Sequence, residues 1–189
     1  PPKGTHRVLS TGDRAASWIA KGNRIPVIGY KPQLARSGNG FVAALLVPEG
    51  NAADSAMLLP LVHEAMDNTG VKLKLAGFDD GYTSKANHKA LAKLKVKHIS
   101  FSGSKALKLV GEEAYADPVL AKARADRSAV ESLMFCLKHV HGFGRLRRRG
   151  IAAVRAELTG KVIVYNMRRA IMLRARGTQC DAEPDAQAA

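Results

Sequence analysis

Two adjacent carboxylates, Asp79 and Asp80, follow a run of apolar residues and are followed by a glycine turn. The apolar run at residues 72–78 predicts a strand, so both carboxylates stand at its C-terminal end. Ligand sites in α/β sheets lie at that end of the strands, and Mg²⁺ prefers oxygen ligands. The pair could therefore hold a metal ion. The alternative is an ordinary turn, because Asp and Gly are frequent turn residues.

A second candidate carboxylate is Glu131, in a segment predicted to be helical. Arg127 lies four residues before Glu131 and Lys138 lies seven after it, so the three side chains share one helical face. The alternative is an ordinary ion pair between Arg127 and Glu131 on a solvated helix. Spacing alone favours the ion pair, so this segment needs further support before a role is assigned.

The chain carries 30 Lys and Arg against 16 Asp and Glu, a net charge of +14. Residues 122–176 hold fourteen of the cations and three of the carboxylates, so about +11 lies there. A positive field of this size attracts polyanions. Nucleic acid is the first candidate partner and an anionic membrane surface the second. The alternative is a merely basic protein with no polyanionic partner.

Other sequence signals exclude several classes of protein. Cys136 and Cys180 are far apart and have no neighbours at zinc-binding spacing, so neither a disulfide framework nor a zinc site is expected. No stretch approaches the roughly 20 apolar residues of a membrane span. The first residues, beginning with Pro1, have no apolar segment typical of a signal peptide. These features fit a protein of a reducing cytosol.

The elements that must position these residues follow from hydrophobic periodicity and turn residues. We expect strands at 6–10, 26–34, 41–47, 72–78 and 96–101, helices at 55–68, about 84–95, 119–139 and 151–176, and an irregular segment at 103–118. Residues 37–40 read Ser-Gly-Asn-Gly, which predicts a hairpin turn. Antiparallel strands followed by β-α-β connections predict a mixed sheet with helices packed on it, an α/β architecture.

The pattern Asp79-x-Gly-Tyr-x-Ser, followed by a helix with Arg-x3-Glu-x6-Lys, resembles the catalytic core of DDE insertion-sequence transposases. Shorter likenesses occur in the same order at residues 18–22, 29–34, 49–55, 142–145, 148–150 and 165–169. The resemblance covers roughly residues 5–175. Each motif is weak alone, whereas their order and spacing together are specific.

The resemblance implies a role for several residues. Asp79 matches the second catalytic carboxylate of the family and Glu131 the third, so both are expected to bind Mg²⁺ or Mn²⁺. Arg127 and Lys138 match the basic partners of the signature helix, which hold DNA phosphates. The tyrosine of that signature falls on Arg124 here, a departure expected to weaken one phosphate contact. A further group of cations, Arg145, Arg147, Arg148 and Arg149, is expected to contact DNA.

The first catalytic Asp of the family belongs to the first strand of its sheet. No apolar strand carrying an Asp precedes residue 13, and both Asp13 and Asp54 match positions that the family uses structurally. We therefore expect this strand to be missing and the chain alone to be inactive. Two carboxylates can hold one metal ion loosely, but they can hardly fix the pair of ions used for phosphoryl transfer.

The expected fold is α/β, a ribonuclease H-like mixed sheet flanked by helices. We expect a catalytic core at residues 1–176, incomplete at its N-terminus, and a disordered tail at 177–189. The expected function is DNA transposition through metal-dependent cleavage and joining of double-stranded DNA at insertion-sequence ends and targets. The expected location is the bacterial cytoplasm, associated with the nucleoid, with no membrane contact, and a homodimer is left open.

Two alternatives remain open. The first is a catalytically inactive DNA-binding fragment of a truncated transposase, which would still bind DNA through its basic helices. The second is a basic RNA-associated α/β domain with no active site.

Overall fold

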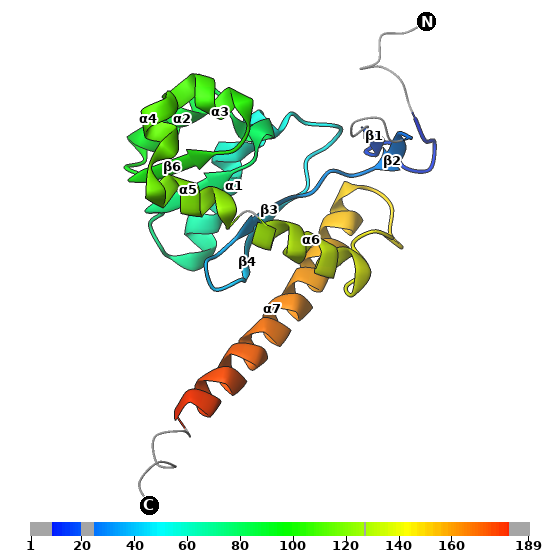
Figure 1. Ribbon diagram of the computed structural model, residues 1–189. Helices are drawn as coiled ribbons and strands as arrows, with labels where there is room; N and C mark the ends of the chain where they lie inside the picture. The colour runs from blue at the N-terminus through cyan, green and yellow to red at the C-terminus, as the bar shows by residue number, and fades with distance from the viewer. Residues whose placement is uncertain (1–8, 20–24, 127, 182–189) are drawn as a thin grey trace, which may run out of the picture.

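The computed structural model of the chain describes residues 9–19, 25–126 and 128–181. Figure 1 shows their arrangement. The strands are β1 (Ser17–Ile19), β2 (Val27–Gly29), β3 (Gln33–Arg36), β4 (Val42–Leu46), β5 (Leu75–Phe78) and β6 (His98–Phe101). The helices are α1 (Asp54–Thr69), the 3-10 helix η2 (Asp80–Tyr82), α2 (Lys85–Lys93), α3 (Ser104–Val110), α4 (Glu112–Ala116), α5 (Pro118–Ala125), α6 (Ser128–His139) and α7 (Ile151–Asp181).

The described strands form three separate pairs. β1 pairs with β2 and β3 with β4, both antiparallel, whereas β5 pairs with β6 in parallel. The α/β class is confirmed, but the expectation of one continuous mixed sheet is wrong for these residues. Part of the reason is Pro32, which has no backbone N–H for a ladder. It divides the predicted strand at 26–34 into β2 and β3, which pair with different neighbours.

The hairpin predicted at residues 37–40 is confirmed. The Gly40 N–H donates to the Ser37 carbonyl at 2.9 Å, and the Ser37 N–H donates to the Phe41 carbonyl at 2.9 Å. Gly40 has a φ of 86°, a conformation that favours glycine. The predicted helix at 55–68 corresponds to α1, and the predicted strand at 72–78 to β5.

Two expectations about the middle of the chain are wrong. Residues 103–118 are not irregular but form α3 and α4, two short helices that each begin after a glycine with positive φ, Gly103 and Gly111. The single helix expected at 119–139 is divided into α5 and α6. The Asp117 side chain starts α5 by accepting the N–H groups of Val119 and Leu120.

The ends of the described chain also differ from expectation. The strand predicted at 6–10 lies mostly outside the described residues, and residues 9 and 10 are not in a strand. β1 instead lies within a segment predicted to be a loop. α7 continues to Asp181, five residues beyond its predicted end. Residues 182–189 of the predicted tail lie outside the described residues.

The buried apolar side chains form two clusters. One lies between α1, α2 and the β5–β6 pair and consists of Leu58, Val62, Leu91, Val96, Phe101 and Ala106. The other lies between β4, α6 and α7 and consists of Val42, Val47, Leu133, Leu137, Phe143, Val154, Leu158 and Val162. Figure 1 shows helices α1 to α5 gathered around the β5–β6 pair, and the long helix α7 extending away from that group past the β3–β4 hairpin.

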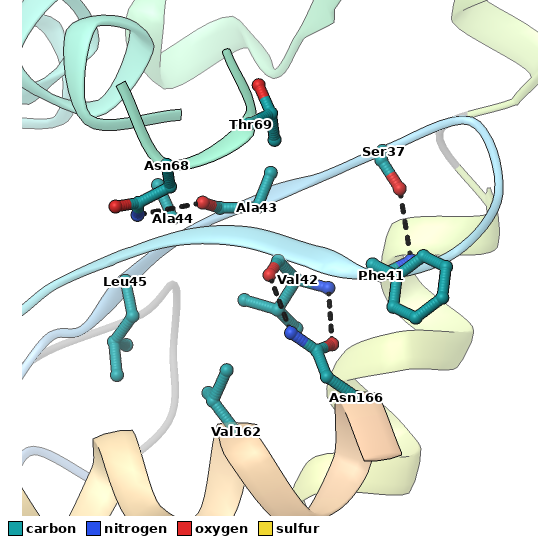
Figure 2. Close-up of a pocket in the computed structure, with 10 residues that line it drawn as sticks. All are labelled: Ser37, Phe41, Val42, Ala43, Ala44, Leu45, Asn68, Thr69, Val162 and Asn166. Carbon is teal, nitrogen blue, oxygen red and sulfur yellow. Dashed lines mark hydrogen bonds between the residues drawn. The ribbon is translucent and has the colours of Figure 1, made fainter. Parts of the chain in front are cut away.

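Polar side chains of α7 form hydrogen bonds with the main chain of the β3–β4 hairpin. The Asn166 amide donates to the Val42 carbonyl and accepts from the Val42 N–H, both at 2.9 Å (Figure 2). The Tyr165 hydroxyl donates to the Gly40 carbonyl at 2.9 Å, and Arg169 Nε donates to the Asn39 carbonyl at 2.8 Å. The motif at residues 165–169 therefore fixes the helix to the hairpin.

Candidate functional site

Asp79 occupies the position that its sequence context predicts. It follows β5 directly and its side chain is exposed. One carboxylate oxygen accepts the Asp80 N–H at 2.8 Å and so caps the 3-10 helix η2. The carboxyl end of a parallel strand is where α/β proteins place ligands. Asp79 is thus held at a fixed point of the sheet edge and faces solvent.

A polar network beside Asp79 joins β3, α1 and η2. Asp54 forms a 2.8 Å ion pair with Lys31 and accepts a 2.8 Å hydrogen bond from Gln33 Nε2. The Tyr82 hydroxyl donates to Gln33 Oε1. Burial, and then the negative charges of Asp54 and Asp79, hold the pKa of Tyr82 well above its usual range. The two carboxylates therefore flank one neutral phenol.

Gly81 is required by the approach of Asp54. A Cβ at position 81 would come within 2.7 Å of Asp54 Oδ2. Any side chain there would force the Asp54 carboxylate to shift from its present position. The glycine of the Asp-x-Gly-Tyr motif thus has a packing role in this network.

Asp80 turns away from Asp79 toward the start of α3. Its Oδ2 lies 3.5 Å from Lys105 Nζ, and a Cβ on Gly103 would come within 2.6 Å of its Oδ1. The position suits a carboxylate, because the N-terminal end of a helix favours negative charge. Asp80 therefore contacts α3 through Lys105 and lies close to Gly103, which precedes that helix.

Glu131 lies in the first turn of α6, and its side chain is exposed. Lys138 lies in the last turn of the same helix and is also exposed. Arg127, the third member of the predicted helical face, lies outside the described residues. The pairing of Asp79 with Glu131 stays a prediction.

Arg124, at the position of the family's signature tyrosine, is engaged within the fold. Its guanidinium lies 3.8 Å from the centre of the Tyr115 ring and also donates to the Tyr115 carbonyl. A cation over an aromatic face is a stabilising arrangement. Arg124 thus joins α5 to α4.

Asp13 joins the N-terminal segment to the rest of the chain. Its carboxylate accepts a 2.6 Å hydrogen bond from the Tyr30 hydroxyl. Burial tends to raise the pKa of Asp13, but hydrogen bonds from Tyr30 and from backbone N–H groups, Gly150 among them, bring it below the ordinary value. Burial first, and then Asp13, raises the pKa of Tyr30 to about 12. Both groups keep their ordinary charge at neutral pH.

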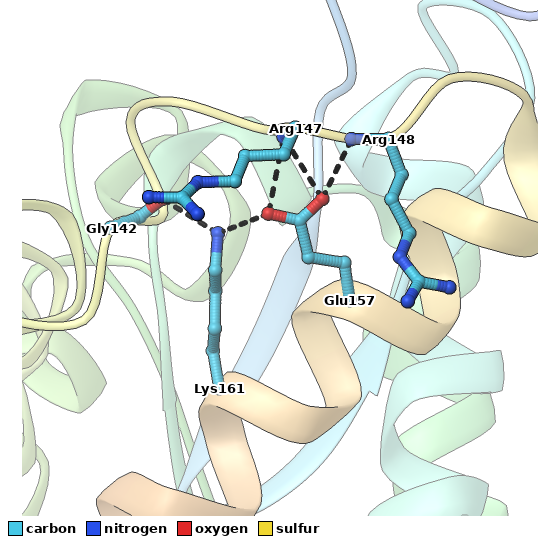
Figure 3. A network of polar contacts seen from close by, with 5 residues as sticks. All are labelled: Gly142, Arg147, Arg148, Glu157 and Lys161. Atoms are coloured by element: carbon cyan, nitrogen blue, oxygen red, sulfur yellow. Dashed lines mark hydrogen bonds and ion pairs between the residues drawn. The ribbon is translucent and has the colours of Figure 1, made fainter.

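The basic segment between α6 and α7, residues 142–150, is held in place by the carboxylate of Glu157, as Figure 3 shows. Glu157 accepts the N–H groups of Arg147 and Arg148 and forms a 2.6 Å ion pair with Lys161. Lys161 also donates to the Gly142 carbonyl at 2.8 Å. The hydrogen bond from Lys161 is the largest cause that lowers the pKa of Glu157. Glu157 binds the main chain of this segment and not the guanidinium groups, and the Arg147 and Arg148 residues are exposed.

Four of the predicted DNA-contacting residues lie between α6 and α7, and all four are exposed: Arg145, Arg147, Arg148 and Arg149. Arg149 also approaches the N-terminal segment, because its Nη1 lies 3.0 Å from where a Cβ on Gly12 would be. The segment thus carries several exposed arginines, and its main chain is held at residues 147 and 148, an arrangement that suits contact with phosphates.

The described residues bring no group of three or more His, Cys, Asp or Glu side chains close enough together to hold a metal ion. Three other carboxylates could be considered as a third metal ligand: Asp13, Asp54 and Asp80. Each of them already contacts another side chain. The Lys31–Gln33–Tyr82 network was not recognised from the sequence. The motif at residues 29–34 contains Lys31 and Gln33, but their partners Asp54 and Tyr82 lie far away in the sequence.

Within the described part of the chain, no helix is both long enough and apolar enough to cross a membrane.

The model of one protein family matches residues 4–167, and its description is "Transposase DDE domain". Comparison with curated proteins and with solved structures finds no match.

Proposed function

Since the chain belongs to the transposase DDE-domain family, whose members act in DNA transposition, we propose that it performs metal-dependent phosphoryl transfer on double-stranded DNA. The reaction is strand cleavage and strand transfer at insertion-sequence ends, carried by a ribonuclease H-like core. We further propose that it works at the bacterial nucleoid, where its substrate lies. The single observation that carries the proposal is the position of Asp79, exposed at the carboxyl end of β5 within the matched residues.

The donor chemistry fits a hard divalent cation. Asp79 and Glu131 offer exposed carboxylate oxygens, and Mg²⁺ is commonly held by one or two carboxylates with water completing the shell. These two residues would hold Mg²⁺ or Mn²⁺. When bound, such an ion polarises a phosphoryl oxygen and activates the attacking hydroxyl.

The residues around Asp79 keep its carboxylate in place. Tyr82 and Asp54 pack on one side of the turn, and the Asp80 N–H fixes one oxygen. Phosphoryl transfer depends on positioning and charge stabilisation rather than on a covalent protein nucleophile. A carboxylate fixed at a sheet edge meets that demand better than one on a mobile loop.

The substrate would be held by cations outside the carboxylate site. We assign this role to Arg127 and Lys138 on the α6 side and to Arg145, Arg147, Arg148 and Arg149 in the segment fastened by Glu157. Such contacts fix the register of the duplex without reading its sequence. The bound form is therefore expected to show little sequence preference and a steep dependence on salt.

A second function is DNA binding without cleavage. It is favoured because three other carboxylates already contact other side chains. Asp54 is paired with Lys31, Asp13 with Tyr30, and Asp80 with Lys105. Using any of these as a third metal ligand would break an existing contact. On this alternative proposal, the 189 residues by themselves bind DNA but do not nick it at a useful rate, because misplacing reacting groups by about 1 Å can cost on the order of a hundredfold.

The test combines binding and nicking with the same preparations. Supercoiled plasmid is incubated with the chain in Mg²⁺ or Mn²⁺, beside the variants Glu131→Gln and Glu64→Gln, and duplex binding is measured separately. Binding without nicking supports the DNA-binding function. Nicking that is lost in Glu131→Gln but kept in Glu64→Gln supports the enzymatic one. Absence of duplex binding would overturn both.

A further inference from the structure

A recess of about 530 Å³ lies where the β3–β4 hairpin meets α6 and α7. Its volume is in the range of small-ligand sites. Arg36 reaches it from β3, and Arg168 and Arg169 reach it from α7. None of the described residues that line it is Asp or Glu. The lining therefore carries three positive charges without a carboxylate among them.

His141 adds an unsatisfied polar atom to this lining. Its Nε2 is buried and has no hydrogen-bond partner among the described residues. The ring packs edge-on against Tyr165, with 5.7 Å between ring centres. Burial, and then the charge of Arg168, lowers the pKa of His141, so its imidazole is neutral at neutral pH. A buried polar nitrogen without a partner is costly, and a ligand in the recess could remove that cost.

Two of the three arginines are already oriented by the hairpin. Arg169 Nε donates to the Asn39 carbonyl at 2.8 Å, and Arg36 Nη1 donates to the Ser37 carbonyl at 3.3 Å. A guanidinium has five N–H donors, so each of these contacts uses only part of its capacity. Arg168 is exposed beside them. The recess thus offers several N–H donors whose positions are set before any ligand arrives.

We propose that this recess binds a phosphate group, held by Arg168 together with Arg36 and Arg169, with His141 Nε2 as a further donor. Arginine recognises phosphate through paired N–H donors. The phosphate can belong to free inorganic phosphate or to the backbone of DNA. Ser132 lines the recess and is adjacent in sequence to Glu131, so a DNA phosphate here would lie near the proposed catalytic carboxylate. The DNA case rests on the proposed function, whereas the free-phosphate case does not.

The test follows the His141 imidazole by nitrogen-detected NMR in the full chain at constant ionic strength. Inorganic phosphate is added in one series and a short DNA duplex in another, with chloride as the reference anion. The variants are Arg168→Gln and Arg36→Gln, with Arg176→Gln as the matched control, since Arg176 is exposed farther along the same helix. Each substitution removes one positive charge from α7, so the two variants have the same net charge.

The expected result is a shift of the His141 resonance on adding phosphate, with half-saturation weakened about tenfold in Arg168→Gln and unchanged in Arg176→Gln. Arg36→Gln gives an independent weakening should Arg168→Gln unfold. A response to phosphate but not to DNA supports the recess as a free-phosphate site, overturns the DNA case and leaves the proposed function untouched. DNA binding that leaves the His141 resonance unmoved, in a chain that also ignores phosphate, overturns the recess and spares the proposed function. Equal weakening by Arg168→Gln and Arg176→Gln overturns it as well.

Discussion

The Arg147 N–H donates to both carboxylate oxygens of Glu157, at 3.0 and 3.2 Å. The contact joins the basic segment at 142–150 to the first turns of α7. Glu157 has a side-chain exposure of only 11 % and also pairs with Lys161. Glu157 therefore positions the arginines that we propose to contact DNA without contacting DNA itself.

Removing the charge of Glu157 should loosen this segment. We expect Glu157→Gln to speed amide hydrogen exchange at Arg147 and Arg148 by about tenfold or more, since a hydrogen bond to a charged group contributes about 1.5–3 kcal/mol. The matched control is Glu64→Gln, because Glu64 also accepts a backbone N–H, that of Leu45. Unchanged exchange at Arg147 and Arg148 would show that the segment is held by other contacts.

Acid should have the same effect as the substitution. The pKa of Glu157 in the folded chain is lowered, so the stabilisation is complete above the unfolded value of about 4.3 and is lost as pH falls through the lower folded value. Following the Arg148 amide shift with pH should give a midpoint below about 4.3, and the transition should disappear in Glu157→Gln. A midpoint at or above the unfolded value would contradict the assigned contacts.

The exposed arginines should carry the salt dependence of DNA binding. Replacing Arg147, Arg148 and Arg149 together with Ala should reduce the slope of log K against log salt by roughly two to three, if all three neutralise phosphates. The matched control replaces Lys89, Lys93 and Lys97, which are exposed on or near α2. An unchanged slope in the arginine variant, or an equal change in both, would mean that the cluster is only a solvated surface.

Asn166 should be a major support of the hairpin. Asn166→Ala removes both hydrogen bonds to Val42 and leaves a partly buried N–H and carbonyl unpaired, so we expect a loss of about 2–3 kcal/mol in the free energy of unfolding. The control is Asn68→Ala, because Asn68 is exposed and donates only to the neighbouring Ala43 carbonyl. Urea denaturation of both variants tests the difference, and similar losses would remove the special role of Asn166.

The parts of the fold that depend on neighbours in sequence could be predicted. The turn at 37–40 is specified by its glycines, α1 by its apolar periodicity, and the strand before Asp79 by its alternation and the turn that follows. The placement of Asp79 at a strand end could be predicted from the sequence for the same reason. α3 and α4 were not, because short helices between glycines have too few turns to show a period.

The parts that depend on distant partners could not be predicted. Tyr82 contacts Gln33, 49 residues away, and Asn166 contacts Val42, 124 residues away. No local pattern marks either pair. The recess lined by Arg36 and Arg168 is hidden for the same reason, since its cations come from opposite ends of the chain.

The most direct test of the proposed metal site uses Mn²⁺ as a paramagnetic probe. Substoichiometric Mn²⁺ is added to the isotopically labelled chain, and the broadening of backbone amides is compared with that in Glu131→Gln and Glu64→Gln. We expect amides near Asp79 and near Glu131 to broaden together, and we expect Glu131→Gln to reduce the broadening at both while Glu64→Gln leaves it unchanged. Broadening near Asp79 alone that persists in Glu131→Gln would contradict this expectation, because the two carboxylates would then not share an ion.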